Sequence, residues 1–524
     1  MKYKSLTAKS PEYSASYWEE CRAFYRGGRD LLENKSLLTR VFPQHANEAP
    51  DIYQDRCRRA TYLAYAGELL DYIVASLAME PLTLTAEPKP PAFYQDFVNS
   101  TDGKSLTLND LIQQQVLTAL ICKTAWTLVD LPPLDSGAVI ESEADEEEYG
   151  LLRAMAFPVE PECVYDWDCT PSGDLEWALI CMRSSPRKRL EDDRNEIVER
   201  YTYYTRDGWE RYDVTYKRDK PPVPNDDIPL TLSGSHSFGQ VPLVRLEVPA
   251  GMWAMDKIHC LCRDIFNKRS GISFSQLRHL FPILTAYLGP EIGPGNEIPA
   301  PIAQDPDRAT NQVYGIGRIV KFGDKDRLEY TSPDCAIYTT SLEDLNGLRD
   351  ELHRVLHQMA LAANNSAAAL KRSGDSKAQD KAAASVVLKK LGEYGRKHAI
   401  DIHNLARAGR MDQPMTWSAH GMQDFDEQAL GDMINEAAVV QTLTIPSPTF
   451  HQIYRYSIAS KAVSGMATPE QLEQIRDEIE AATTAEEFDP QRKMDLETAA
   501  VMGPPEPDGD EIPDDTGRDK YNEA

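Results

Sequence analysis

Apolar residues recur with helical spacing along two stretches that flank a segment rich in glycine and proline. The second stretch, from about Thr340 to Ala362, has apolar residues at alternating steps of three and four: Leu345, Leu348, Leu352, Val355 and Met359. The first stretch, from Ala254 to Phe281, has a similar period: Ile258, Leu261, Ile265, Ile272, Leu277 and Leu280. Gly289 and Pro290 follow it as a stop signal. The pattern predicts two long helices, each with one apolar seam.

The segment between these helices, Gly289 to Tyr338, reads as loop and short strands. Two helices that run out from the body and back again, joined at the far end by a β segment, would form a stalk with a knob at its tip. Each helix would be about 35 to 40 Å long, at about 1.5 Å per residue, which is longer than a small core needs. We therefore expect the seams to pack against copies of the same chain. The residues expected to pack the stem are Ile258, Leu261, Ile265, Leu345, Leu348, Leu352, Val355 and Met359.

The rest of the chain falls into a helical, a β-rich and a second helical region. Up to about residue 130, the pattern predicts three helices, with a cap at Thr107 for the third: Tyr17 to Glu33, Tyr53 to Met79 and Ser105 to Leu120. Between Leu151 and Leu246, aromatic and β-branched runs predict strands at 175–182, 197–204 and 209–216, the last two joined as a hairpin through 206–208. After Arg410 helices return: Asp424 to Val440, Pro448 to Ser460 and Thr468 to Ala481.

Length and composition predict a soluble chain of two or more modules. The 524 residues are 41% hydrophobic, which can supply a substantial core. No run approaches 18 uncharged apolar residues, and the first twenty residues lack an apolar signal core, so we expect neither a membrane span nor a secretory signal. The nine cysteines have no C-x-x-C spacing, which favours a reduced cytosolic compartment with the thiols packed as small apolar groups.

The charge is strongly negative and unevenly spread. A formal net charge of −27 argues against tight binding of nucleic acid, which needs clustered Lys and Arg. Residues 371–410 are the exception, with ten Lys or Arg against four acids; a solvated basic helix face is the plain alternative to a functional role. The acidic runs 141–148 and 501–524 are expected to be a solvated loop and a disordered tail.

The sequence shows little that could support catalysis. It has no phosphate loop and no Gly-x-Ser-x-Gly nucleophile turn. His353 and His357 lie one helical turn apart and could bind a metal, but no glutamate lies between them. His259, Cys260 and Cys262 would point in different directions on a helix. We expect no enzyme activity, no catalytic residue, no cofactor and no metal.

Three strings resemble those of tailed-bacteriophage portal proteins, in the same order along the chain. Residues 42–45 and 53–62, continuing to Leu82, resemble the N-terminal helix cassette of that family. Phe238 to Val244 is similar to the strand that leads into the first stem helix, and Gly323 to Tyr330 resembles the strand pair that enters the second. The resemblance extends over roughly residues 10 to 480. It does not account for the acidic run 141–148 or for the acidic tail.

The resemblance implies an α+β, mainly helical fold with wing, long-helix stem, β-containing clip and helical crown, assembled as a ring that usually has twelve subunits. It divides the chain into a wing (1–250), a first stem helix (251–288), a clip (289–338), a second stem helix (339–362), a tunnel loop (363–376), a long wing helix (377–410), crown helices (411–485) and an acidic tail (486–524).

The tunnel loop is the stretch that the resemblance brings nearest to DNA. Residues 364–376 are small or polar, without a large apolar anchor, which predicts mobility. In portal proteins a loop at this position lines the narrowest part of the channel, so the resemblance implies that the following residues face DNA: Asn364, Asn365, Ser366, Lys371, Arg372, Ser373 and Asp375. A plain connection facing solvent is the alternative.

The function implied is a channel at one capsid vertex through which double-stranded DNA is packaged and ejected. The implied partners are further copies of the chain, double-stranded DNA without sequence preference, the large subunit of the terminase motor, head-to-tail adaptors, and the major capsid and scaffolding proteins. No membrane partner is implied. The protein would be made in the bacterial cytoplasm and end in the virion. A ring-forming adaptor or minor capsid protein is the main alternative, and a metal-dependent hydrolase using His353 and His357 is a third.

Overall fold

The structure is a computed structural model that describes residues 1–46, 48–79, 81–131, 154–187, 195–279, 283–287, 327–331, 335–360, 374–422, 447–463 and 469–487. Side chains in the long helices are described up to 276 in the first, from 338 to 355 in the second and from 387 in the third. The chain divides into two units, Met1–Phe425 and Asp426–Ala524. The first unit mixes helices and strands, as the α+β prediction requires. None of the helices in the described ranges is long and apolar enough to cross a membrane.

The N-terminal helices are shorter than the sequence pattern predicts. They are α1 (Tyr3–Leu6), α2 (Ala15–Arg26), α3 (Gly28–Leu32), α4 (Lys35–Val41), α5 (Pro50–Arg58), α6 (Tyr65–Leu77), α7 (Phe93–Asn99) and α8 (Leu108–Cys122). The single helix predicted over 17–33 is wrong because Gly27 has φ +65°, and a Cβ there would lie 2.9 Å from the Cβ of Ala64. The cap predicted at Thr107 is confirmed, since its Oγ1 accepts from the N–H of Asp110 at 3.1 Å.

The helix predicted over 53–79 is also interrupted, by contacts distant in sequence. Between α5 and α6, the N–H of Thr61 donates to Oγ of Ser270 at 3.1 Å, and that hydroxyl donates to the carbonyl of Thr61. The buried ring of Tyr62 donates its hydroxyl to the carbonyl of Phe24 at 2.9 Å. These bonds satisfy backbone groups that a continuous helix would otherwise pair, so tertiary contacts override the helical periodicity here.

A small three-stranded sheet lies against α8 at the centre of the first unit. It has the order β3 (Met155–Val159), β2 (Thr124–Asp130) and β9 (Leu243–Glu247), all antiparallel. Six of the seven residues of β2 are buried, so the strand lacks the alternation that would have distinguished it from a helical segment. The prediction that the chain is helical up to residue 130 is therefore wrong at β2 and at β1 (Thr83–Glu87).

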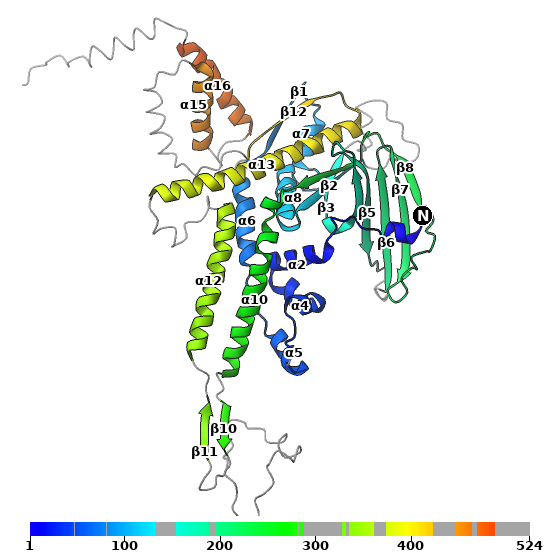
Figure 1. Ribbon diagram of the computed structural model, residues 1–524. Helices are drawn as coiled ribbons and strands as arrows, with labels where there is room; N and C mark the ends of the chain where they lie inside the picture. Colours follow the sequence, from blue (N-terminus) through cyan, green and yellow to red (C-terminus); the bar gives the residue numbers. More distant parts are fainter. Residues whose placement is uncertain are drawn as a thin grey trace, which may run out of the picture. The chain divides into compact units, whose positions relative to one another are not determined.

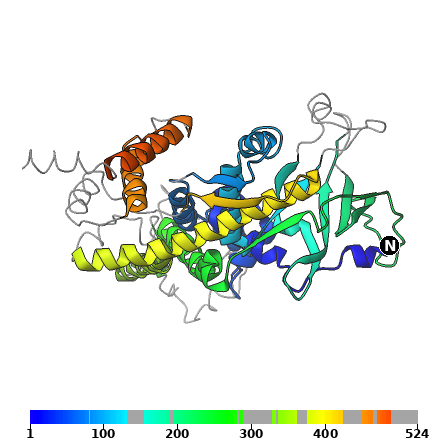
Figure 2. The ribbon, with the colours of Figure 1, turned by 90° about the horizontal axis from the view of Figure 1, so that it is seen from above.

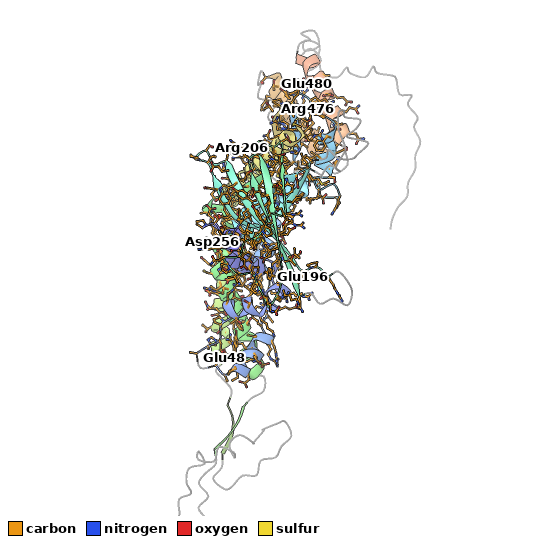
Figure 3. All side chains as sticks on the ribbon, turned by 90° about the vertical axis from the view of Figure 1, so that its right-hand side faces the viewer. Glu48, Glu196, Arg206, Asp256, Arg476 and Glu480 are labelled. Carbon is orange, nitrogen blue, oxygen red and sulfur yellow. The ribbon has the colours of Figure 1, made fainter. Side chains whose placement is uncertain are left out.

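A five-stranded antiparallel sheet confirms the predicted ribbons. Its order is β4 (Val164–Cys169), β5 (Leu175–Ser184), β6 (Glu196–Thr205), β7 (Gly208–Lys217) and β8 (Leu232–Ser235). β6 and β7 form the expected hairpin, with Tyr204 opposite Trp209 beside the turn. Arg206 in this turn and Glu196 at the start of β6 mark the two ends of the ribbon in Figure 3. Two short 3-10 turns, η1 (Pro161–Cys163) and η2 (Ala250–Met252), join the sheets to their neighbours.

Two long antiparallel helices, both predicted, carry a strand pair at their ends (Figure 1). They are α10 (Ala254–His279) and α12 (Cys335–Ala360), which pack along each other. The first stem helix, predicted over 251–288, is wrong at its end, because the helix ends at His279 and residues 283–287 form a strand. β10 (Ile283–Tyr287) pairs antiparallel with β11 (Arg327–Thr331). The helix predicted to begin near 340 begins five residues earlier, so residues 335–338 belong to α12 and not to the predicted clip. Most of the predicted clip, residues 289–326, lies outside the described residues.

A third long helix, α13 (Gly374–Arg410), crosses the first unit and packs on α12, α8, α6, β2 and β9 (Figure 2). After it, β12 (Thr416–His420) pairs antiparallel with β1. The prediction that only helices follow residue 410 is therefore wrong at this strand, which belongs to the first unit.

The second unit contains α15 (Pro448–Ala462) and α16 (Pro469–Glu487), which pack on each other. Both were predicted, and Pro469 is the first residue of its helix, as expected. The helix predicted over 424–440 lies outside the described residues.

Candidate functional site

The apolar seams of α10 and α12 are buried within one chain. Ile258, Ile265, Leu345 and Leu352 are at most 5% exposed and belong to the main core, together with residues of α2, α6 and α8. Leu261, Leu348 and Val355 are half-buried against the same core. The side chain of Met359 lies outside the described residues. The expectation that these seams need neighbouring copies to cover them is wrong, because the chain's own helices already do so.

Polar contacts also hold the two helices in place. Nζ of Lys268 on α10 pairs with Asp344 on α12. The guanidinium of Arg349 lies 4.7 Å from the ring centroid of Tyr65 on α6, close enough for a cation–π contact. At the other side of α10, Nε2 of His259 lies 3.2 Å from Oε2 of Glu20 on α2. α12 is thus anchored to α6, and α10 to α2.

The start of α10 is fixed by Tyr17, whose hydroxyl donates to Oδ1 of Asp256 at 2.7 Å. Figure 3 labels Asp256 on the body of the first unit. Burial, followed by the bond to Asp256, raises the pKa of Tyr17, so the phenol keeps its proton and remains the donor.

The outer flanks of the pair are charged and open. On α10, Lys257, Arg263 and Asp264 are exposed; on α12, Glu343 and Asp350 are exposed. A Cβ added at Gly271 of α10 or Gly347 of α12 would meet nothing within 4 Å. Among the described residues, the inner side of the helix pair is covered and the charged side is left open.

The residues predicted to face DNA lie largely outside the described residues. These are Asn364, Asn365, Ser366, Lys371, Arg372 and Ser373. The predicted loop ends too late, because residues 374–376 form the first turn of α13 and include Asp375. Gly374 opens this helix. The side chains of that first turn are not among those described.

The second half of α13 is buried more deeply than its charge suggests. His398 is 2% exposed, and its Nε2 lies 2.8 Å from Oγ1 of Thr127 on β2. His403 is fully buried among the rings of Tyr94, Phe97 and Trp417. Burial lowers the pKa of His398 to about 3 and that of His403 to about 4, so both rings are neutral near pH 7. The spacing of Leu391, Ile402 and Leu405 predicts an apolar side of this helix that packs on the body, and these residues are buried. Sequence reasoning missed the two histidines, because Lys and Arg residues surround them in the sequence.

The two histidines considered as metal ligands, His353 and His357, both lie on α12. His353 is half-buried, and the side chain of His357 is not described. Cys262 is buried and Cys260 exposed, which confirms that these neighbours point in different directions. No group of three or more His, Cys, Asp or Glu in the described ranges could hold a metal ion. The eight cysteines with described side chains are all free.

An open groove of about 600 Å³ lies among α2, α3, α4 and η1. Its charged groups neutralise one another. Arg22 pairs with Glu162 at 2.9 Å and with Glu160, Arg26 pairs with Asp30, and Arg29 pairs with Glu33. The groove therefore presents no concentrated charge of one sign to a ligand.

Comparison with known proteins finds no matching family model and no matching curated protein. Solved structures also match, and two of them align over most of the chain. One, described as the neck of an empty gene transfer agent particle computed with C6 symmetry, is 11% identical with a TM-score of 0.34, covering 79% of this chain and 95% of that one. The other, described as the virion of a native gene transfer agent particle, is 10% identical with a TM-score of 0.36, covering 80% and 96%. Likeness at these scores does not establish a shared fold.

Proposed function

We propose that the chain is a portal-type subunit that assembles into a ring at one capsid vertex, through which double-stranded DNA is packaged and ejected. The observation that carries the proposal is the arrangement of α10, β10, β11 and α12: two antiparallel helices of 26 residues each, about 39 Å long, followed by an antiparallel strand pair. Hydrophobic spacing predicted both helices, and residues 323–330, which resemble portal proteins, overlap β11.

The charge of the chain fits passage of DNA better than its retention. The chain as a whole, with a net charge of −27, repels phosphates, while the segment 371–410 is basic. A few phosphate contacts at cellular salt give weak binding without sequence preference. Lys371 and Arg372 would supply such contacts from the tunnel loop.

The partners of the ring follow from the same proposal. Further copies of the chain form its wall, and the terminase large subunit, the head-to-tail adaptor and the major capsid and scaffolding proteins contact its outside. The virion is its final location. No enzymatic role, cofactor or metal is proposed.

Native mass spectrometry of the purified full-length chain tests the assembly. The proposal expects a closed oligomer of one defined copy number. Monomers under every condition of salt and concentration would contradict it, and stoichiometric zinc in the same spectra would favour a metal-dependent hydrolase. If capsids assembled without the ring hold as much nuclease-protected DNA as capsids assembled with it, the ring is an adaptor and not the packaging channel.

The Lys371→Glu, Arg372→Glu double variant tests the DNA-facing assignment. We expect an unchanged ring mass and less nuclease-protected DNA in assembled capsids, because two phosphate contacts become repulsive. Failure of this variant to fold would show that the loop is structural, and normal DNA retention would remove these two residues from the channel wall.

A further inference from the structure

Two arginines from the long helices converge on one tyrosine at the start of α6. Nη1 of Arg269 on α10 donates to the hydroxyl oxygen of Tyr65 at 3.4 Å. The guanidinium of Arg349 on α12 lies 4.7 Å from the centroid of the same ring. All three side chains are half-buried. Two positive charges from different helices therefore meet at one side chain that is not a carboxylate.

Neither arginine has a negatively charged acceptor among the described residues. Arg349 forms no hydrogen bond or ion pair within the described ranges, and its Nε is buried without an acceptor. Within the same ranges, Arg269 donates only to Tyr65. The positions three and four residues away on each helix hold no acid: Ile265, Phe266, Ile272 and Ser273 around Arg269, and Leu345, Asn346, Leu352 and His353 around Arg349.

The other buried and half-buried arginines in the described ranges all reach a carboxylate or a carbonyl oxygen. Arg22 pairs with Glu162, Arg56 with Glu48, Arg211 with Asp213, Arg245 with Glu247 and Arg410 with Asp412, while Arg396 and Arg407 donate to carbonyl oxygens. A guanidinium has five N–H donors, and withdrawing it from water without an acceptor is costly. The donors of Arg269 and Arg349 are therefore available to a ligand that brings its own acceptors.

The acids on the same helices leave the charge of the two arginines in place. Asp344 is already paired with Lys268. Asp350, next to Arg349 in the sequence, projects about 100° further round α12. Glu68 of α6 is exposed, and no ion pair joins it to a described side chain. The first turn of α6 adds the positive end of a helix dipole. The cluster is thus locally positive in a chain whose net charge is −27.

We propose that Arg269 and Arg349, together with the hydroxyl of Tyr65, bind a phosphate group between α6, α10 and α12. The planar fork of a guanidinium matches two oxygens of a phosphate, and its hydrogen bonds to an anion are stronger than those to a neutral acceptor. The bound group neutralises two like charges and links three helices that pack on one another. The site is independent of the proposed ring, because all three residues belong to one chain.

Isothermal titration calorimetry of the full-length chain with inorganic phosphate tests the site. Chloride at the same ionic strength is the control for screening. The wild type should bind one phosphate per chain. Arg269→Gln and Arg349→Gln should each weaken binding about tenfold or more, because each removes a charge-assisted pair. Arg354→Gln removes an exposed charge further along α12 and should leave the affinity unchanged.

Two conservative variants keep the test informative if a glutamine variant does not fold. Arg349→Lys keeps the charge but loses the planar fork, and Tyr65→Phe keeps the ring but loses the hydroxyl group. Both should bind phosphate more weakly than the wild type. Thermal unfolding gives a second measurement, since phosphate should raise the melting temperature of the wild type and raise it less in these variants.

Competition separates the two sources of a phosphate group, inorganic phosphate and the DNA backbone. A short DNA duplex that displaces phosphate from the wild type, and binds Arg349→Gln more weakly, would assign the site to a phosphodiester. A duplex that leaves the bound phosphate in place would assign it to inorganic phosphate. No binding by the wild type, equal affinity in the wild type and both glutamine variants, or equal stabilisation by chloride would overturn the site.

Discussion

Glycines on two sets of long helices meet opposite surroundings. In α13, a Cβ at Gly392 would lie 2.1 Å from the carbonyl oxygen of Met422, and one at Gly409 would lie 2.3 Å from the ring of Phe238. In α10 and α12, a Cβ at Gly271 or Gly347 would meet nothing within 4 Å. α13 is therefore embedded in the body, whereas α10 and α12 have one side that the described part of the chain leaves open. The packing around α13 is complete within one chain, whereas the open side of α10 and α12 is the surface that a neighbouring copy could contact.

The largest effect is expected on the buried side of α12. Leu352→Ala should lower the free energy of unfolding by about 2–5 kcal/mol, because it leaves a cavity in the main core. Leu342, 42% exposed on the same helix, is the control, and its change to alanine should cost less than about 1 kcal/mol. Urea unfolding measures both. Equal effects would mean that α12 does not have a buried and an open side.

The contrast between glycines gives the next effect. Gly392→Ala should destabilise the chain by about 1–3 kcal/mol, because the added methyl group must displace the backbone at Met422. Thermal unfolding measures the loss. A variant as stable as the wild type would show that α13 can shift freely, against its embedded position.

The neutral, buried histidines of α13 make stability depend on pH. An unfolded histidine has a pKa of about 6.5, whereas the folded pKa of His403 is lowered to about 4, so the unfolded chain binds protons more readily. The contribution of neutral His403 to the free energy of unfolding is fully present above pH 6.5 and is lost as the pH falls toward 4. At pH 5 the free energy of unfolding is lower by about 2 kcal/mol from this residue. His398 adds to the loss in the same direction.

His403→Phe should make this pH dependence shallower, since the ring lies among three aromatic side chains and its Nε2 has no hydrogen-bond partner within the described ranges. Unfolding free energies at pH 7.5, 6 and 5 measure the slope. An unchanged slope would indicate that His403 is protonated, or exposed, in the folded chain.

The smallest effect is a gain. Gly347→Ala should stabilise the isolated chain by about 0.5–1 kcal/mol, because alanine is the better helix former and open space surrounds the position. Differential scanning calorimetry at low protein concentration measures it. A loss of stability there would show that this side of α12 is already covered within the chain.

The sequence predicted the elements whose pattern is local. The hairpin of β6 and β7, the cap at Thr107 and the long helices α10, α12 and α13 each depend on spacing or turn residues within one segment. The breaks at Gly27 and at residues 59–64 depend on contacts with Ala64 and Ser270, which no local pattern contains.

The position of the helix pair α10 and α12 could be predicted from the sequence, but the residues that cover its apolar side could not. Hydrophobic spacing located both helices and their apolar residues, but could not show that α2, α6 and α8 cover those residues within the same chain.

Class averages from negatively stained, full-length wild-type protein test the central claim most directly. The account predicts rings of one copy number with a central hole, whose side views show the α10–α12 pairs arranged around the axis. Single particles of monomer size at every salt and protein concentration would contradict it.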